Sequence, residues 1–160
     1  MLSDSNDEKF ENKTFAGPLE VLKIFKNLQQ DRISFYTQME LCQKNYLEKK
    51  IDNQTYLAIT NTITNGFSSI SFNINEIEEI LRIELSRDDL ADFIKKLQKY
   101  EKEKLKLTVQ KYILLSQSKN LVEGTVDDLK SIDEELKTLV NNISELLEEI
   151  QAEIAELSMD

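Results

Sequence analysis

The chain has 160 residues, a formal net charge of −10, 40% hydrophobic residues and 31% charged residues. Its three glycines and one proline are too few for the turns of an all-β or α/β domain of this length, whereas abundant Leu, Ile, Glu and Lys favour a few long helices. The acidic balance also argues against a general nucleic-acid-binding protein, because phosphate contacts need an excess of Lys and Arg.

The first helix is expected to follow a polar tail. Residues 1–17 have no apolar periodicity, which predicts a disordered N-terminal tail. Pro18 suits the first turn of a helix that should reach about Lys50. Residues that are mostly apolar then recur at helical spacing, and we call such a row along one helix face a seam. Arg32 interrupts this first seam, which consists of Val21, Phe25, Leu28, Phe35, Met39, Cys42 and Tyr46.

Two further helices follow after short connections. Asp52 can cap the second helix, and Ser86 and Asp89 form a capping-box pattern before the third. The second seam is nearly unbroken and consists of Tyr56, Ile59, Ile63, Phe67, Ile70, Ile74, Ile77 and Leu81. The third contains Leu90, Ile94, Leu97, Leu105, Thr108 and Tyr112. Because short loops force neighbouring helices to run antiparallel, residues 18–122 should form a three-helix antiparallel bundle.

The last helix is the most acidic part of the chain. Thr125 and Asp128 form a second capping-box pattern, and the seam that follows runs from Leu129 to Leu157. Residues 124–160 contain eleven acidic and two basic residues, a charge of −9. We expect residues 125–158 to pack on the bundle or to dimerise through the helix at 126–157. The fold class is therefore all-α, an elongated antiparallel bundle or coiled coil of about four long helices.

No catalytic, cofactor-binding or metal-binding residues stand out. The chain has no histidine and no glycine-rich phosphate loop, and its clusters of carboxylates lie on single helices, where they usually point into water. The lone Cys42 falls on the first seam and suits a buried structural thiol. We therefore predict that the protein is not an enzyme and needs no cofactor.

The compartment follows from similar observations. One cysteine cannot form an internal disulfide, no stretch is apolar enough to span a membrane, and the N-terminal sequence lacks the features of a signal or transit peptide. These features predict a protein of the nucleus or the cytoplasm.

Four lysines form a stripe on the third helix, at four, three and four residues apart: Lys95, Lys99, Lys102 and Lys106. The stripe could meet phosphate or an anionic lipid surface. The simpler interpretation is a solvated face whose charges pair locally, as Lys99 would with Glu103, or are attracted to the acidic last helix. We favour the simpler interpretation, and we expect no strong direct binding of nucleic acid.

Arg32 is the charged residue inside the first seam, and two interpretations of it stay open. Its side chain could extend to the edge of the bundle, or it could pair with a carboxylate and fix the register of the helices. A role in register or partner binding and a simple extension to water are equally compatible with the sequence.

Two stretches resemble a known family. Leu28, Gln29 and Arg32, followed by Tyr36, match the Leu-Gln-x-x-Arg-x-x-x-Tyr signature of the "required for excision" B-type DNA-repair family. A second block matches in Leu97, Gln98 and Glu101 and in the Leu-x-Leu-Thr motif; its members here are Leu105, Leu107 and Thr108. The resemblance covers about residues 19 to 117 and implies a small helical protein linked to nucleotide excision repair of DNA, with no active site to carry over.

The leading hypothesis is a non-enzymatic interaction or adaptor protein that binds a protein partner, such as a DNA-repair factor. The candidate partner-binding residues are Gln29, Arg32, Tyr36, Gln98 and Glu101. The alternative is a coiled-coil tether or scaffold unrelated to repair, and a third hypothesis is a membrane-associated bundle that uses the lysine stripe.

Overall fold

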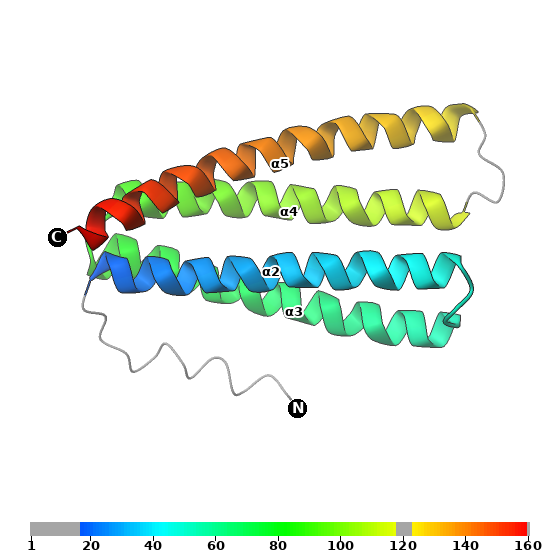
Figure 1. Cartoon of the computed structure of the whole chain (residues 1–160), viewed down its shortest axis with the longest axis horizontal. Coiled ribbons are helices and arrows are strands. Elements are labelled where there is room, and N and C mark those ends of the chain that lie inside the picture. The colour runs from blue at the N-terminus through cyan, green and yellow to red at the C-terminus, as the bar shows by residue number, and fades with distance from the viewer. Residues whose placement is uncertain (1–16, 118–122, 160) are drawn as a thin grey trace.

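The computed structural model describes residues 17–117 and 123–159, which form four long helices and no strand (Figure 1). The helices are α2 (Pro18–Leu47), α3 (Asn53–Glu79), α4 (Asp88–Gln117) and α5 (Glu123–Ser158), and a π-helical turn, η1 (Ile80–Glu84), extends α3. Successive helices run antiparallel, so the predicted all-α bundle is confirmed. The tail predicted for residues 1–17 falls almost entirely outside the described residues.

The connection between α2 and α3 follows local sequence rules. Helix α2 begins with Pro18 at its first position, where a missing N–H group costs nothing. It ends before Lys49, which has a left-handed backbone with φ 58°. The Asp52 carboxylate then accepts a hydrogen bond from the Thr55 N–H at 2.7 Å. The predicted cap of the second helix is therefore confirmed.

The connection between α3 and α4 differs from the prediction. Ser86 has φ 53° and α4 begins at Asp88, so Ser86 does not cap this helix. Instead it lies where the preceding helix closes, because the Leu85 N–H donates to the Ile80 carbonyl and the Arg87 N–H donates to the Leu81 carbonyl at 2.7 Å. Helix α5 begins earlier than predicted, at Glu123, so Thr125 lies in its first turn.

The main core lies where α2 and α4 begin and α5 ends (left in Figure 1). Its most completely buried side chains come from α2, α3, η1 and α4; they are Val21, Leu22, Phe25, Ile74, Ile77, Leu81, Leu90, Ile94 and Leu97. Helix α5 adds Ile143, Leu146, Ile150 and Ile154. Full burial of one such side chain stabilises the fold by about 1.5–3 kcal/mol. All four helices are therefore held together at this end.

A second, smaller cluster contains Met39, Ile63 and Phe67, and α2, α3 and α4 alone build it. Between α2 and α3 the Phe35 ring stands directly over Gly66, and a Cβ atom added at Gly66 would overlap that ring. Gly66 thus allows the two helices to approach closely, although glycine is a poor helix former.

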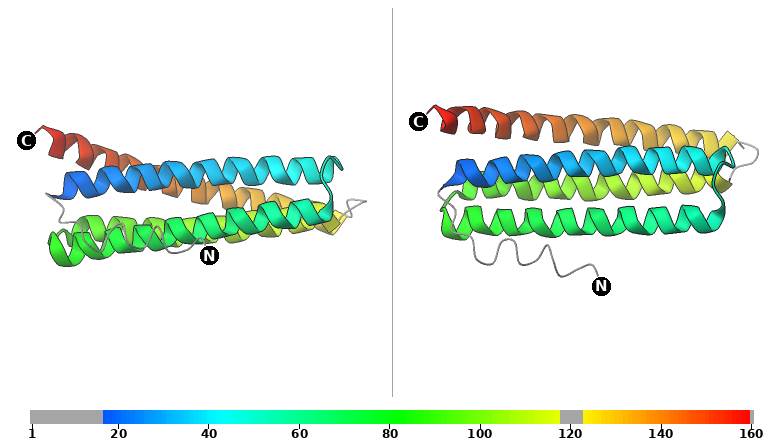
Figure 2. Two further views of the ribbon diagram at one scale, coloured as in Figure 1. Left: turned by 90° about the horizontal axis from the view of Figure 1, so that it is seen from below. Right: turned by 60° about the horizontal axis from the view of Figure 1, so that its bottom comes forward.

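Helix α5 is buried unevenly along its length. Its second half enters the main core, but Val126 and Val140 in the first half are 46% and 43% exposed. Figures 1 and 2 show α5 diverging from α2 towards its own start, where it lies beside α4. The first half therefore rests on one helix and the second half on two. None of the described helices has the length and apolarity that crossing a membrane would require.

Candidate functional site

Arg32, which interrupts the first seam, and Glu101, which lies within the eight-residue step from Leu97 to Leu105 of the third seam, are both inside the bundle. Arg32 on α2 is 3% exposed and Glu101 on α4 is 5% exposed. Along their helices both lie between the residues of the main core and those of the second cluster, and Phe35 beside them packs against both clusters. A buried charge must be paired and hydrogen-bonded to be tolerated. The contacts of these two residues therefore define the site.

Gln29 joins the two charged groups. Its Nε2 donates to Glu101 Oε1 at 2.7 Å, and its Oε1 accepts a hydrogen bond from Arg32 Nη1 at 2.9 Å. Gln29 is itself 5% exposed. The amide thus connects the positive group on α2 to the negative group on α4 through hydrogen bonds with both, and its own two ends are satisfied.

The second terminal nitrogen of the Arg32 guanidinium, Nη2, reaches the other two helices. Its Nη2 donates to Gln98 Oε1 at 2.6 Å and to Ser71 Oγ at 3.3 Å. Gln98 in turn donates to the Ser71 carbonyl at 3.1 Å and to Asn75 Oδ1 at 3.0 Å. These six residues, Gln29, Arg32, Ser71, Asn75, Gln98 and Glu101, are called the polar network below. The network connects α2, α3 and α4 and fixes their relative positions.

Burial dominates the electrostatics of the network. It lowers the pKa of the Arg32 guanidinium, while the nearby Glu101 and then Tyr36 act in the opposite direction. Burial is also the main cause that raises the pKa of Tyr36, followed by the negative charge of Glu101. Tyr36 therefore stays a neutral phenol at physiological pH. Its ring lies edge-on to Phe67 at 4.8 Å and below the Lys104 ammonium at 4.2 Å.

A groove of about 680 Å³ lies above the network, between α3 and α4. Arg32, Tyr36 and Glu101 line its inner side. The α3 wall presents hydroxyl, amide and aromatic side chains; these are Thr64, Phe67, Ser68, Ser71, Phe72 and Asn75. The α4 wall presents Gln98, Lys99, Lys102 and Leu105. The groove therefore combines apolar surface with polar groups and positive charge, which is the usual character of a binding site.

The structure locates the lysine stripe beside this groove. Lys95, Lys99, Lys102 and Lys106 are all exposed, and Lys99 and Lys102 line the groove. Within the described ranges none of the four forms an ion pair, so the expected pairing of Lys99 with Glu103 is absent there. An ion pair between Lys111 and Asp133 joins α4 to α5 instead.

The turn before α4 also holds α5. Arg87 donates to Asp89 at 2.9 Å and to Glu153 at 2.8 Å. These hydrogen bonds raise the pKa of the Arg87 guanidinium, with Asp89 the larger cause. The acidic last helix is thus attracted to α4 at positions outside the lysine stripe.

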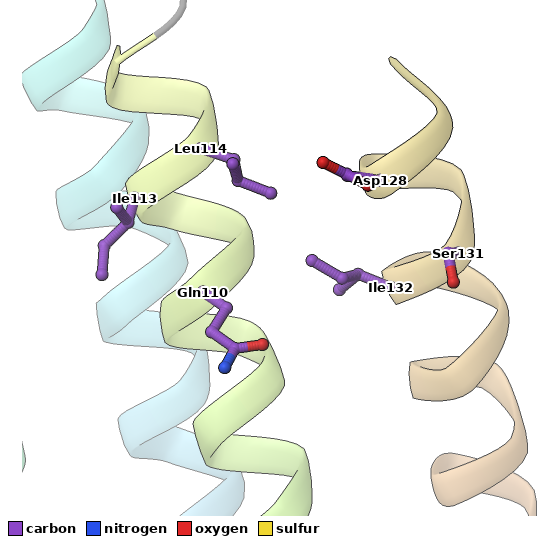
Figure 3. A pocket seen from close by; sticks show the side chains of 6 residues that line it. All are labelled: Gln110, Ile113, Leu114, Asp128, Ser131 and Ile132. Carbon is purple, nitrogen blue, oxygen red and sulfur yellow. The ribbon is translucent and has the colours of Figure 1, made fainter. Parts of the chain in front are cut away.

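A second opening of about 390 Å³ lies between α4 and the first half of α5. Figure 3 shows Leu114 of α4 and Ile132 of α5 pointing towards one another across it, with Asp128 beside them. This opening reflects the one-sided support of α5 described above. It contains no residue predicted to bind a partner.

The candidate partner-binding residues do not form one exposed surface. Gln29, Arg32 and Glu101 are buried, and Tyr36 and Gln98 are half-buried. Arg32 does not extend to water, since it is 3% exposed, and its guanidinium is hydrogen-bonded to side chains of three helices, as a register-fixing contact requires. The direct pairing with a carboxylate is not found among the described residues, where Glu101 is reached through Gln29. A role of these five residues in partner binding stays a prediction, and a partner would approach them through the groove.

Sequence reasoning missed Ser71 and Asn75, which complete the network from α3. It also missed Gln43, which accepts a hydrogen bond from Tyr56 and donates to Ser116 at 3.1 Å, joining the same three helices at their other end. No spacing rule marks these small polar residues. The eight-residue step from Leu97 to Leu105 could have marked Glu101 as a seam position.

Cys42 is a free thiol that is buried, as predicted, and burial raises its pKa. Among residues 17–117 and 123–159, no three His, Cys, Asp or Glu side chains come together as a group that could hold a metal ion.

The family model described as DNA repair REX1-B matches residues 20–115 of the chain. The matched range spans α2, α3, η1 and nearly all of α4, and it contains the whole polar network. It ends before α5. No curated protein and no solved structure matches the chain.

Proposed function

The chain belongs to the DNA repair REX1-B family, and from this membership we propose that it acts in DNA repair as a non-enzymatic interaction protein. In this proposal the helical unit of α2, α3 and α4 binds a protein partner. Helix α5 supports that unit by covering one end of it.

The single observation that carries the proposal is the polar network below the groove. Six side chains from three helices are joined to one another by hydrogen bonds. Such a network rigidifies the helices that it joins, and a rigid surface binds a partner at a lower entropic cost than a flexible one. The walls of the groove on α3 and α4 are then held at a constant separation.

The absence of histidine from the whole sequence supports a non-enzymatic role, since histidine is the commonest general base. The buried Arg32 and Glu101 are bonded through Gln29 and lie in the interior, an arrangement that suits a structural function. Recognition of helical partners by grooves between helices is a common mode of protein binding.

Loss-of-function cells test the proposal. Cells that lack the protein should survive ultraviolet irradiation less well than wild-type cells, and the wild-type chain should restore survival. Affinity purification of the tagged chain, followed by mass spectrometry, should recover DNA-repair factors. Wild-type survival of the deletion cells across a range of doses would refute the repair role.

One observation favours a second candidate, a coiled-coil tether that dimerises through α5. The first half of α5 leaves Val126 and Val140 exposed and its seam residues half-buried. Light scattering on the full chain and on a Val126→Glu/Val140→Glu variant tests it. A dimer that the variant converts to a monomer would support the tether, and a monomeric wild-type chain would exclude it.

A further inference from the structure

The two walls of the α3–α4 groove carry different charges. Residues 53–75, which form most of α3, include no Asp, Glu, Lys or Arg. The α4 wall has Lys99 and Lys102 at the groove and Lys95 and Lys106 one turn away on either side. The stripe spans twelve residues, from Lys95 to Lys106, and its eleven steps cover about 16 Å along a helix. One long side of the groove is therefore positively charged and the other is neutral.

These positive charges are available to a ligand. Within the described part of the chain the four lysines form no ion pair, and all four are exposed. The acidic helix α5 is paired elsewhere, through Lys111 and Arg87. At physiological ionic strength charges interact over about 8 Å, so a ligand in the groove senses these lysines more strongly than the distant acidic residues of α5.

The groove also offers apolar surface. Phe72 on the α3 wall is 49% exposed, an unusual position for a large aromatic side chain. The half-buried Leu105 lines the groove beside it, whereas Phe67, which also lines the groove, is 4% exposed and belongs to the second cluster. An apolar side chain of a ligand could cover part of Phe72 and gain about 25 cal/mol for each Å² that is removed from water. The ligand should thus carry apolar groups next to negative ones.

We propose that the α3–α4 groove binds an acidic amphipathic helical segment of a partner protein. The apolar face of the segment packs on Phe72 and Leu105, and its carboxylates meet Lys99 and Lys102. This inference rests on the proposed function as an interaction protein and names the chemistry of the partner.

The groove fits a peptide better than a nucleic acid. Single strands are bound by successive aromatic side chains on which bases stack. Of the groove's aromatic residues Phe72 is exposed, Tyr36 is half-buried and Phe67 is buried, so they offer no series of stacking rings. A nucleic acid also carries one negative charge per nucleotide, which the net charge of −10 repels more strongly than the few carboxylates of a short helix.

Fluorescence anisotropy on the full chain tests the proposal. The probe is a fluorescein-labelled peptide of about 16 residues, or about 24 Å as a helix, with Leu and Phe on one face and Glu on the other. The wild-type chain should bind it, with affinity that falls as salt rises. A peptide with Gln in place of every Glu and a dT oligonucleotide of similar length should bind more weakly.

Two pairs of matched variants locate the site. Lys99→Glu/Lys102→Glu should weaken peptide binding at least about tenfold. The control Lys23→Glu/Lys130→Glu changes the net charge of the chain by the same amount, at positions on α2 and α5, and should change peptide binding less than about twofold. Phe72→Ser should weaken binding, and Leu41→Ser, at a residue that is 57% exposed on α2, should not. Circular dichroism must show the same helical content for all four variants.

Several results would overturn the assignment. They are an absence of peptide binding, binding that the groove variants and their controls change equally, and tighter binding of the oligonucleotide with the same dependence on Lys99 and Lys102. If the peptide fails to bind while the chain still restores ultraviolet survival, the groove assignment is wrong and the proposed function stands. If deletion cells survive normally, the proposed function is wrong whatever the peptide does.

Discussion

Replacing Arg32 with Met tests whether the polar network fixes the bundle. The substitution keeps an unbranched side chain of moderate size but removes the guanidinium, which is 3% exposed. Glu101 would keep its bond from Gln29 and lose the nearby positive charge. Gln29 Oε1 and Gln98 Oε1 would each lose a donor.

The magnitude follows from the burial of both charges. Breaking a buried ion pair by removing one partner costs about 3–5 kcal/mol. Here Gln29 bridges the charges, so we expect the lower half of that range. A domain of this size has about 5–15 kcal/mol of stability, so Arg32→Met should shift the unfolding midpoint clearly.

A double variant separates the charge from the packing. In Arg32→Met/Glu101→Leu, both charges are replaced by apolar side chains, an exchange that is often neutral or stabilising. Urea unfolding followed by circular dichroism should therefore show the double variant to be at least about 2 kcal/mol more stable than Arg32→Met. A loss of unfolding free energy below about 1 kcal/mol in Arg32→Met would refute the coupling. A loss in the double variant equal to the sum of the losses in Arg32→Met and Glu101→Leu, measured singly, would also refute it.

Three further predictions concern the fold around the site. Gly66→Ala should destabilise the protein in thermal unfolding even though alanine favours a helix by about 1 kcal/mol, because the new Cβ overlaps the Phe35 ring; a stabilised variant would contradict the close approach of α2 and α3. Asp52→Ala should lower stability at pH 6 and have progressively less effect below the ordinary carboxyl pKa of 3.8. Hydrogen bonds from Thr55 lower the pKa of Asp52 in the folded state, so the stabilisation by Asp52 is fully present above pH 3.8 and is lost as the pH falls through the pKa of the folded state. A destabilisation by Asp52→Ala that stays constant down to pH 2 would contradict this. Ile150→Ala should cost about 2–5 kcal/mol in urea unfolding and Ile132→Ala clearly less, because Ile150 is 2% exposed in the main core and Ile132 is half-buried; equal losses would contradict the uneven support of α5.

Periodicity was sufficient to predict the helices. Apolar residues at three-residue and four-residue steps located all four, and the side chain of Asp52 identified one helix start. The π-turn could not be predicted, because a change from four-residue to five-residue hydrogen bonding leaves the apolar spacing of Ile77 and Leu81 intact. The same turn explains why Ser86, a good cap by type, does not act as one.

The seam of α5 shows another limit of spacing. Leu129, Ile132 and Leu136 continue the same pattern as Ile143 and Ile150, yet only the later residues are buried. Spacing identifies the face of a helix that prefers to be covered. Whether a second helix lies close enough to cover it depends on how α2 and α5 diverge, which the sequence of α5 alone does not contain.

Four of the six residues of the polar network were singled out from the sequence, but their arrangement was not predicted. Two motifs marked Gln29, Arg32, Gln98 and Glu101, and the expectation was a surface for a partner. In the fold these residues bind mainly one another, because each occupies or adjoins a seam position that faces the interior. The groove above them depends on the separation of α3 and α4, and no local pattern in either helix reports that separation.

Whether the α3–α4 groove serves DNA repair by binding a partner can be measured as the survival of irradiated cells. Deletion cells would receive the wild-type chain, Lys99→Glu/Lys102→Glu or its charge-matched control Lys23→Glu/Lys130→Glu, at equal protein levels. We expect the wild-type and control chains to restore ultraviolet survival and the groove variant to leave the cells sensitive. Full restoration by the groove variant would contradict this expectation.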